Sequence, residues 1–291
     1  MECPVCESTR PDEERYCLRC GAALNPGHAV GSCTVVISFD LDGPSGMINR
    51  HPEFERQPSA RSFGEYGPAV GAPHVLALLA RTGIPASFYI PGWVAERHTA
   101  LVAGIAEAGH EVGHHGYLHE PPATLNREQE AEVLDKGSAI LAGIVGAAPR
   151  GYRSPSWELS EHSLELLEER DFLYDSSLMG SDAPYVVGES LVELPIHWSL
   201  DDYPYFMFGP ADGRRLMASP QQVFETWAAA FEECHSRGAV FTLTMHPYII
   251  GRPGRLSMLE RLIHHMRSFS GVEFLRGVDV AEAVRGAFLS E

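Results

Sequence analysis

The chain lacks the features of a membrane-spanning or exported protein. No apolar run in its 291 residues approaches the ~20 residues needed to cross a bilayer. The N-terminal stretch, MECPVCESTR, has neither the basic region nor the apolar region of a signal peptide. We therefore expect a cytoplasmic protein that does not use a membrane as a partner.

Positive charge is also scarce. The sequence holds 22 basic against 39 acidic residues, and its formal net charge is −17. Such a charge disfavours nucleic acids and anionic membranes as partners. The chain also has no Gly-rich phosphate loop after a predicted strand, no internal repeat and no low-complexity tract. These absences argue against nucleotide-binding and repeat architectures.

Cysteine is concentrated at one end of the chain. Four of the six cysteines follow the pattern C-x2-C-x10-C-x2-C, namely Cys3, Cys6, Cys17 and Cys20. Four thiolates in two such pairs suit structural Zn²⁺, which would supply the folding energy of so small a segment. We predict a zinc ribbon over residues 1–24, a linker over 25–32 and one large domain over 33–291. Disulfides and a rubredoxin-like iron site are the alternatives.

The rest of the chain alternates strands with helices. We predict strands at 34–39, 86–90, 151–153, 172–174, 191–196, 239–245 and 272–275, with a short one before the histidine cluster. We predict helices at 73–82, 95–108, 126–145, 160–169, 219–234, 256–268 and 279–289. This α/β alternation indicates a parallel sheet, and the number of units suits a barrel. Residues 44–73 show no periodicity, which favours a long functional loop over the site.

Candidate metal ligands fall just after two of the strands. Asp40 and Asp42 end the first strand, and extended backbone would point both carboxylates to the same side. Like charges so close are costly unless a cation or a proton relieves them. His115 and His119 would share one face if a helical turn joins them, and could then bind one metal ion. An Asp-Gly turn and histidines buried in the core are the alternatives.

Four segments occur in an order that resembles a known family. They read SFDLDG, HHGYLH, GYRSP and LTMHP. Together they resemble the polysaccharide deacetylase family, carbohydrate esterases of family four, over the chain from Thr34 onward. The leucine between the two acids, the HGYLHE segment and the Ser-Leu-Asp-Asp after a tryptophan are similar to its peptidoglycan-deacetylase-like and cyclic-imidase-like branch. The resemblance implies a catalytic domain with a distorted, incomplete (β/α) barrel, and a homo-oligomer.

The resemblance implies metal-dependent hydrolysis of a carbon–nitrogen bond outside a peptide. It assigns the metal to Asp42, His115 and His119, with zinc first and cobalt or manganese as alternatives. The ion would bind water and the substrate carbonyl oxygen, which lowers the pKa of the water and polarises the carbonyl. Asp40, beside that water, would be the general base. Its alternative role is to accept a hydrogen bond from a ligand histidine.

Further site residues also follow from the motifs. His246 matches the late histidine of the family, which would protonate the departing nitrogen. Arg153 matches the arginine that orients the catalytic acid. Trp157 either lines the pocket or fills the core, and Asp175 is a second candidate for the pocket. The acidic partner of His246 stays open among three residues: Asp175, Asp201 and Asp202.

The motifs leave the substrate open. An N-acetyl sugar and a cyclic imide both present an amide carbonyl, so we expect a small molecule or a glycan and keep deacetylation and imidase- or allantoinase-like ring opening as alternatives. Two other functional classes share part of this pattern. A non-haem iron oxygenase also uses two histidines and one carboxylate, but commonly at another spacing. A non-catalytic protein would use the zinc ribbon to bind a protein partner beside a degenerate barrel.

Overall fold

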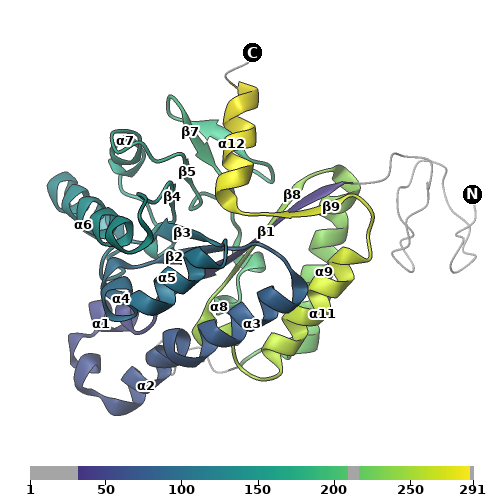
Figure 1. Ribbon diagram of the computed structural model, residues 1–291, viewed down its shortest axis with the longest axis horizontal. Coiled ribbons are helices and arrows are strands. Elements are labelled where there is room, and N and C mark those ends of the chain that lie inside the picture. The colour runs from purple at the N-terminus through teal and green to yellow at the C-terminus, as the bar shows by residue number, and fades with distance from the viewer. Residues whose placement is uncertain (1–31, 209–215, 289–291) are drawn as a thin grey trace, which may run out of the picture.

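The structure is a computed structural model that describes residues 32–208 and 216–288 (Figure 1). The predicted zinc ribbon, with Cys3, Cys6, Cys17 and Cys20, lies outside the described residues, as does the predicted linker apart from its last residue. Within the described part, nine strands form one sheet. No described helix is both long enough and apolar enough to span a membrane.

The sheet is organised around β1 (Cys33–Asp40). On one side β1 pairs along its length with β8 (Val240–Met245), and its two halves pair with β9 (Val272–Leu275) and β2 (Ser87–Ile90). Beyond β2 the strands follow in the order β3 (Glu111–His114), β4 (Gly151–Tyr152), β5 (Tyr174–Asp175), β7 (Leu191–Glu193) and β6 (Tyr185–Val187). All pairs are parallel except β6 with β7.

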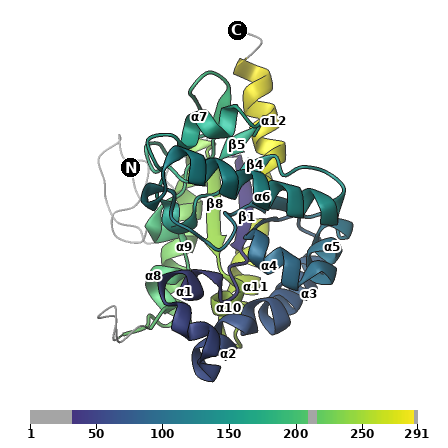
Figure 2. The ribbon, with the colours of Figure 1, turned by 90° about the vertical axis from the view of Figure 1, so that its left-hand side faces the viewer.

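The sheet is curled but open. No pairing joins β8 to β6 among the described residues. The longer helices lie around the outside of the sheet (Figures 1 and 2), namely α3 (Ala72–Thr82), α5 (Thr99–Glu107), α6 (Arg127–Val145), α9 (Pro220–Arg237), α11 (Arg255–Arg267) and α12 (Gly277–Phe288). The predicted α/β fold with an incomplete barrel is therefore confirmed.

The alternation of side chains along β1 separates the core from the site. Val35, Ile37 and Phe39 belong to the main hydrophobic core. Ser38 and Asp40 point to the opposite face, because successive strand residues alternate, and both contact a buried arginine inside the barrel. The first strand thus supplies core on one face and polar groups on the other.

The prediction of a long loop at residues 44–73 is wrong. This segment forms α1 (Ser45–Arg50), a short 3₁₀ helix (Pro52–Arg56) and α2 (Pro58–Tyr66), followed by a wide helical turn that leads into α3. Two of the pieces begin at a proline, which suits the first position of a helix. Each piece is too short to produce a readable 3.6-residue period, so the sequence pattern hides them.

Other boundaries also differ from the prediction. The helix expected at 95–108 is two helices, α4 (Gly92–Arg97) and α5, which meet at His98. The helix expected at 160–169 is shorter, as α7 (Ser163–Glu168). Several short elements were not predicted, among them β6, α8 (Tyr203–Phe206) and α10 (Pro247–Ile250).

Candidate active site

Three predicted metal ligands converge at the carboxyl ends of β1 and β3. Asp42 Oδ1 lies 3.3 Å from His115 Nε2, and Asp42 Oδ2 lies 3.6 Å from His119 Nε2. One potential ligand atom from each residue lies within 4.8 Å of the other two, and all three side chains are buried. One carboxylate and two imidazoles at this separation form the usual donor set of a three-ligand metal site.

The predicted helical turn between the two histidines is absent. Residues 115–120 have no helical backbone, and His119 adopts a left-handed φ of 61°. The turn is held instead by Glu120, whose carboxylate accepts hydrogen bonds from the backbone N–H groups of Tyr117 and Leu118 at 3.1 and 2.8 Å. The two imidazole rings still meet, with centroids 5.0 Å apart. The pairing was therefore predicted for the wrong geometric reason.

The hydrogen bonds of the triad leave its metal-facing atoms free. His115 Nδ1 donates to the carbonyl oxygen of Arg153 at 2.7 Å, which leaves a lone pair on Nε2 in the neutral ring. That nitrogen faces Asp42 Oδ1, a buried oxygen without a hydrogen-bond partner among the described residues. Two electron-rich atoms so close are stabilised by a cation between or beside them, so the residues present fit a divalent metal.

The protonation states of Asp42 and His119 also suit metal binding. Burial alone would raise the pKa of this carboxyl, but the neighbouring His119, His115 and His246 hold it well below its usual range. Burial lowers the pKa of His119 to about 4 against the opposing charge of Asp42, and the positive charge of Arg50 acts in the same direction as burial. An ionised carboxylate and a neutral imidazole are the forms that ligate metals.

Asp40 is held by a buried arginine. Arg153 Nη1 donates to Asp40 Oδ1 at 2.8 Å and to Ser38 Oγ at 2.9 Å. The guanidinium also donates to the backbone and side chain of Ser176, and lies 4.1 Å above the ring of Tyr89. The other oxygen of Asp40, Oδ2, lies 3.9 Å from His115 Nε2. Arg153 thus fixes one oxygen and leaves the other facing the triad.

The acidic partner of His246 is now identified by geometry. Asp202 Oδ1 accepts a hydrogen bond from His246 Nδ1 at 2.7 Å, and both Asp202 oxygens accept from the backbone N–H of His246. Asp201 is farther away, at 3.5 Å from the same ring nitrogen. Burial opposes a charge on the imidazole, but Asp201 and Asp202 raise the pKa of His246 well above its usual value. The opposite nitrogen, Nε2, faces Asp42 Oδ2 at 3.8 Å.

His246, Asp201 and Asp202 also lie close enough together to hold a metal ion. However, the Asp202 oxygens already accept hydrogen bonds from His246, and Asp201 Oδ1 accepts one from the backbone N–H of Tyr203. These residues therefore fit a hydrogen-bonded His246–Asp202 pair, in which the proton lies on the histidine, better than a second metal site.

Asp175 lies away from this site. It neighbours Glu193 across strands β5 and β7, and its Oδ1 accepts a hydrogen bond from Ser177 Oγ at 2.6 Å. Its carboxylate is fully buried and is not among the residues that line the cavity. The suggestion that Asp175 contributes to the pocket is therefore not supported by its position.

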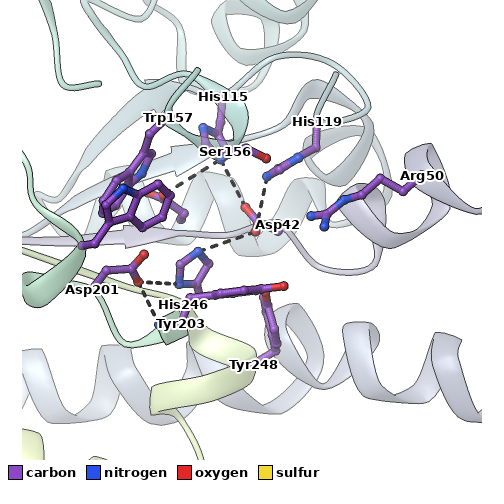
Figure 3. A pocket seen from close by; sticks show the side chains of 12 residues that line it. Asp42, Arg50, His115, His119, Ser156, Trp157, Asp201, Tyr203, His246 and Tyr248 are labelled. Carbon is purple, nitrogen blue, oxygen red and sulfur yellow. Dashed lines mark hydrogen bonds and ion pairs between the residues drawn. The ribbon is translucent and has the colours of Figure 1, made fainter. Parts of the chain in front are cut away.

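A cavity of about 170 Å³ opens over the triad (Figure 3). Trp157 lines it and stacks on Trp198, with ring centroids 4.3 Å apart. Ser156 and Trp157 both have left-handed backbone, with φ of 60° and 57°. Strain of this kind is often found at functional sites, where the surrounding structure maintains it. The full lining is Asp40, Asp42, Arg50, His115, His119, Ser156, Trp157, Trp198, Asp201, Tyr203, His246 and Tyr248.

Five of these lining residues were not predicted individually: Arg50, Ser156, Trp198, Tyr203 and Tyr248. Arg50 belongs to the segment that was expected to cover the site as a loop, so its neighbourhood was correct although its helix was missed. Tyr203 belongs to an aromatic-rich stretch after β7. Ser156 and Tyr248 follow predicted motif residues by one to three positions. Proximity to a motif at the end of a strand was the available signal.

Known proteins resemble this chain over most of its length. The family model described as polysaccharide deacetylase matches residues 62–174. A peptidoglycan deacetylase of Helicobacter pylori is 33% identical over 278 residues, which cover 85% of this chain and 94% of that protein. A Mycobacterium smegmatis structure of the polysaccharide deacetylase type is 38% identical, with a TM-score of 0.85 and coverage of 89% of this chain and 92% of that one.

An allantoinase structure is similar in fold alone. It is 21% identical, with a TM-score of 0.75 and coverage of 94% of this chain and 97% of that one. The Helicobacter pylori relative, by contrast, combines substantial identity with nearly complete coverage of both chains. The chain therefore belongs to the polysaccharide deacetylase family and is a hydrolase that acts on amide bonds.

Proposed function

We propose that this protein removes the acetyl group from an N-acetylated sugar by metal-dependent hydrolysis. The observation that carries the proposal is the convergence of Asp42, His115 and His119 around a buried carboxylate oxygen that lacks a hydrogen-bond partner. Asp42, His115 and His119 would hold the ion, zinc first and cobalt or manganese as alternatives. When bound, a divalent ion supplies Lewis acidity, which polarises the amide carbonyl and makes water more acidic.

Asp40 acts as the general base in this proposal. Its Oδ2 faces the triad, while Arg153 holds its Oδ1. A fixed carboxylate beside the reacting centre can remove a proton from water as the water attacks the carbonyl carbon. Arg153 keeps that carboxylate in place through hydrogen bonds to Asp40, Ser38 and Ser176, so it is a positioning residue.

His246 acts as the general acid. Asp202 receives a hydrogen bond from Nδ1 and fixes the ring, so that Nε2 faces the cavity on the far side of Asp42 from His119. From there Nε2 can protonate the departing nitrogen as the carbon–nitrogen bond breaks, which yields acetate and a free amine. Base and acid thus approach the carbonyl from different strands, Asp40 from the end of β1 and His246 from the end of β8.

Acetate release from N-acetylglucosamine and short chitooligosaccharides tests this function. We expect release by zinc-loaded protein, loss after chelation, and recovery with Zn²⁺, Co²⁺ or Mn²⁺. Asp40→Asn should lower kcat by about 10²- to 10⁴-fold, the range of general base catalysis, and keep the metal. Asp182→Asn changes an exposed acid and serves as the control. Full activity of Asp40→Asn would refute the base assignment.

Cyclic imides form a second candidate substrate class. The observation that favours them is the size of the cavity, about 170 Å³, which is below the usual range of 300–1,000 Å³ for drug-sized ligands. The same assay with succinimide and hydantoin decides between the classes. Ring opening at a kcat/KM above that of every acetylated sugar would replace deacetylation with imide hydrolysis.

A further inference from the structure

The cavity has two unlike ends on either side of the metal triad. Figure 3 shows the aromatic rings of Trp157 on one side of Asp42 and the guanidinium of Arg50 on the other. The tryptophan end presents apolar ring faces, since Trp157 stacks on Trp198. The arginine end presents positive charge. A substrate whose amide sits at the triad can therefore meet a different kind of group at each end.

Arg50 has no acidic partner in the described part of the chain. Its Nε donates to the carbonyl oxygen of Gly46 at 3.2 Å, and its guanidinium forms no ion pair with a carboxylate among the described residues. The residue is exposed and is the last one of α1. Its side chain lines the cavity, so the guanidinium retains donors that can bind a ligand.

The helix that carries Arg50 is docked directly on a proposed metal ligand. Asn49 Nδ2 donates to the carbonyl oxygen of His119 at 3.2 Å. Gly46 passes so close to His119 that a Cβ atom there would lie 3.1 Å from the ring nitrogen Nδ1. These contacts fix the start of the Arg50 side chain relative to the triad, so its charge has a defined place beside the reaction centre.

The charge of the remaining lining explains why such a cation matters. Asp40, Asp42 and Asp201 line the same cavity, and the chain as a whole carries a net charge of −17. A negatively charged substrate is attracted only where positive charge outweighs these carboxylates, which is at the proposed metal ion and at Arg50. Guanidinium groups bind carboxylates and phosphates through paired hydrogen bonds.

We propose that Arg50 determines substrate specificity by binding an anionic group, a carboxylate or a phosphate, on the same substrate that presents the amide to the triad. The preferred substrate is then an acidic N-acetyl compound rather than a neutral one. The identity of the amide in this inference rests on the proposed function. The preference for an acidic substrate depends only on Arg50.

Three compounds with the same acetamide group test the inference: N-acetylglucosamine, N-acetylmuramic acid and N-acetylglucosamine 6-phosphate. Binding to the zinc-loaded full chain is measured by calorimetry, and acetate release is measured in parallel. We expect one or both acidic compounds to bind at least about tenfold more tightly than the neutral one, in line with a charge-assisted hydrogen bond. The better of the two acids identifies the anionic group.

Variants of Arg50 separate charge recognition from general damage. Arg50→Gln should bring the ratio of acidic to neutral affinity down to about one, because it removes the charge and keeps a hydrogen-bond donor. Arg50→Lys should retain part of the preference, and Arg50→Glu should reverse it. Arg56→Gln removes an exposed arginine of the neighbouring turn that does not line the cavity, and should leave all three affinities unchanged.

The outcomes distinguish this inference from the proposed function. Equal effects of Arg50→Gln on neutral and acidic compounds, or a wild-type preference for the neutral compound, would overturn the role of Arg50 even if acetate is released. Absence of acetate from every compound would refute deacetylation, while the binding ratios would still decide the role of Arg50. Failure of all three compounds to bind would overturn both.

Discussion

Two adjacent histidines have opposite environments. His115 faces Asp42 in the cavity, whereas His114 is buried in the core against the rings of Tyr152 and Phe172. His114 Nε2 donates to the carbonyl oxygen of Leu134 at 3.2 Å, and burial lowers the pKa of His114 to about 3. Strand alternation at the end of β3 accounts for the difference.

We predict that alanine variants of these two histidines fail in different ways. His115→Ala should lose the metal and the activity, because the site loses one of three ligands. His114→Ala should still bind the metal but unfold more easily, by about 2–4 kcal/mol, since a buried and hydrogen-bonded ring is removed. Metal titration and urea unfolding of both variants measure this. Equal loss of metal in the two variants would contradict the assignment of His115.

A second residue-scale feature is the buried acid pair away from the cavity. Asp175 and Glu193 are cross-strand neighbours, and neither Asp175 Oδ2 nor Glu193 Oε2 has a hydrogen-bond partner among the described residues. Burial, together with the charge of Asp175, raises the pKa of Glu193 to about 10. One proton shared by the two carboxyl groups satisfies both oxygens.

We predict that this pair makes the protein less stable as pH rises. The unfolded chain releases the Glu193 proton near pH 4.5, whereas the folded chain keeps it until about pH 10. The stabilisation is therefore complete below pH 4.5 and is lost as pH rises toward 10. Glu193→Gln keeps a donor without titrating, so at pH 9 it should exceed the wild type in stability by at least about 1 kcal/mol.

Urea unfolding of both proteins between pH 5 and pH 9 measures this difference. At pH 5 the variant should have little or no advantage, because this pH lies only just above the value of 4.5 at which the unfolded chain releases the Glu193 proton, so little of the wild-type stabilisation has been lost. Glu189→Gln changes an exposed acid on the same hairpin and is the matched control. Stability profiles of wild type and Glu193→Gln that run parallel over this range would contradict a shared proton.

The sequence could indicate which residues form the metal site, but not which acid pairs with His246. Asp42, His115 and His119 follow strands that are neighbours through β2, so the parallel-sheet hypothesis brings them to one edge. Asp202 was one of three equal candidates for His246, because the choice depends on the path from β7 back to the end of β8. A bridge between Asp201 and Thr244 fixes that path, and no local pattern announces it.

At the scale of elements, the turn between His115 and His119 depends on residues from two places. Its backbone is held by Glu120 within the turn and by Asn49 from α1. In this position the backbone of His119 adopts a strained, left-handed φ of 61°. A helix would have been the simplest way to pair two histidines four residues apart, so spacing alone predicted a helix.

We predict that Asn49→Ala weakens metal binding without unfolding the protein. The carbonyl oxygen of His119 loses its donor, and the strained turn loses its support from α1. Loss of outer support for a ligand typically lowers metal affinity by about 10- to 100-fold. Competition with a chelating dye measures the affinity, and thermal unfolding checks the fold.

Asn126→Ala is the matched control for this prediction. Asn126 forms the capping box of α6, in which its side chain accepts from the backbone N–H of Gln129 at 2.9 Å. Its loss should lower the stability by about 1 kcal/mol and leave metal affinity unchanged. An Asn49→Ala variant with wild-type metal affinity would show that Glu120 alone maintains the turn.

Long elements were predictable and short ones were not. The capping box of α6 and the buried strands β1 and β8 carry strong local signals, and the structure contains all three. The segment that became α1 and α2 carries prolines and glycines whose pattern suits loops equally well. Its helices are fixed by tertiary contacts, such as those of α1 with His119, which a local pattern does not record.

At the scale of the whole molecule, the chain is predicted to carry two metals of different kinds. The four thiols of Cys3, Cys6, Cys17 and Cys20 are expected to hold structural zinc, whereas the barrel site has nitrogen and oxygen ligands. We predict two metal ions per full chain. Removing residues 1–30 should delete one and leave the other, as measured by elemental analysis. A truncated protein without any metal would contradict the barrel site.

The shape of the site bears on the size of the substrate. The cavity of about 170 Å³ is bordered by the stacked Trp157 and Trp198 and by Tyr203 from α8, which narrow the approach to the triad. A polymer needs an open groove along which several units bind, whereas a single small ring needs only the cavity. The lining thus favours a compact substrate.

We predict a higher kcat/KM on monomeric N-acetyl compounds or small cyclic imides than on polymeric chitin or peptidoglycan. Acetate or ring-opening assays at equal concentrations of amide groups measure the ratio, and short oligomers of two to six sugars give the intermediate cases. Trp198→Ala should lower the ratio of kcat/KM on small compounds to kcat/KM on polymers, because removal of a partly exposed ring opens the cavity edge and gives longer substrates access. Robust release of acetate from intact peptidoglycan without turnover of any small amide would reverse the order, and would mean that Trp157 and Trp198 form a platform for polymer rather than a border of the cavity.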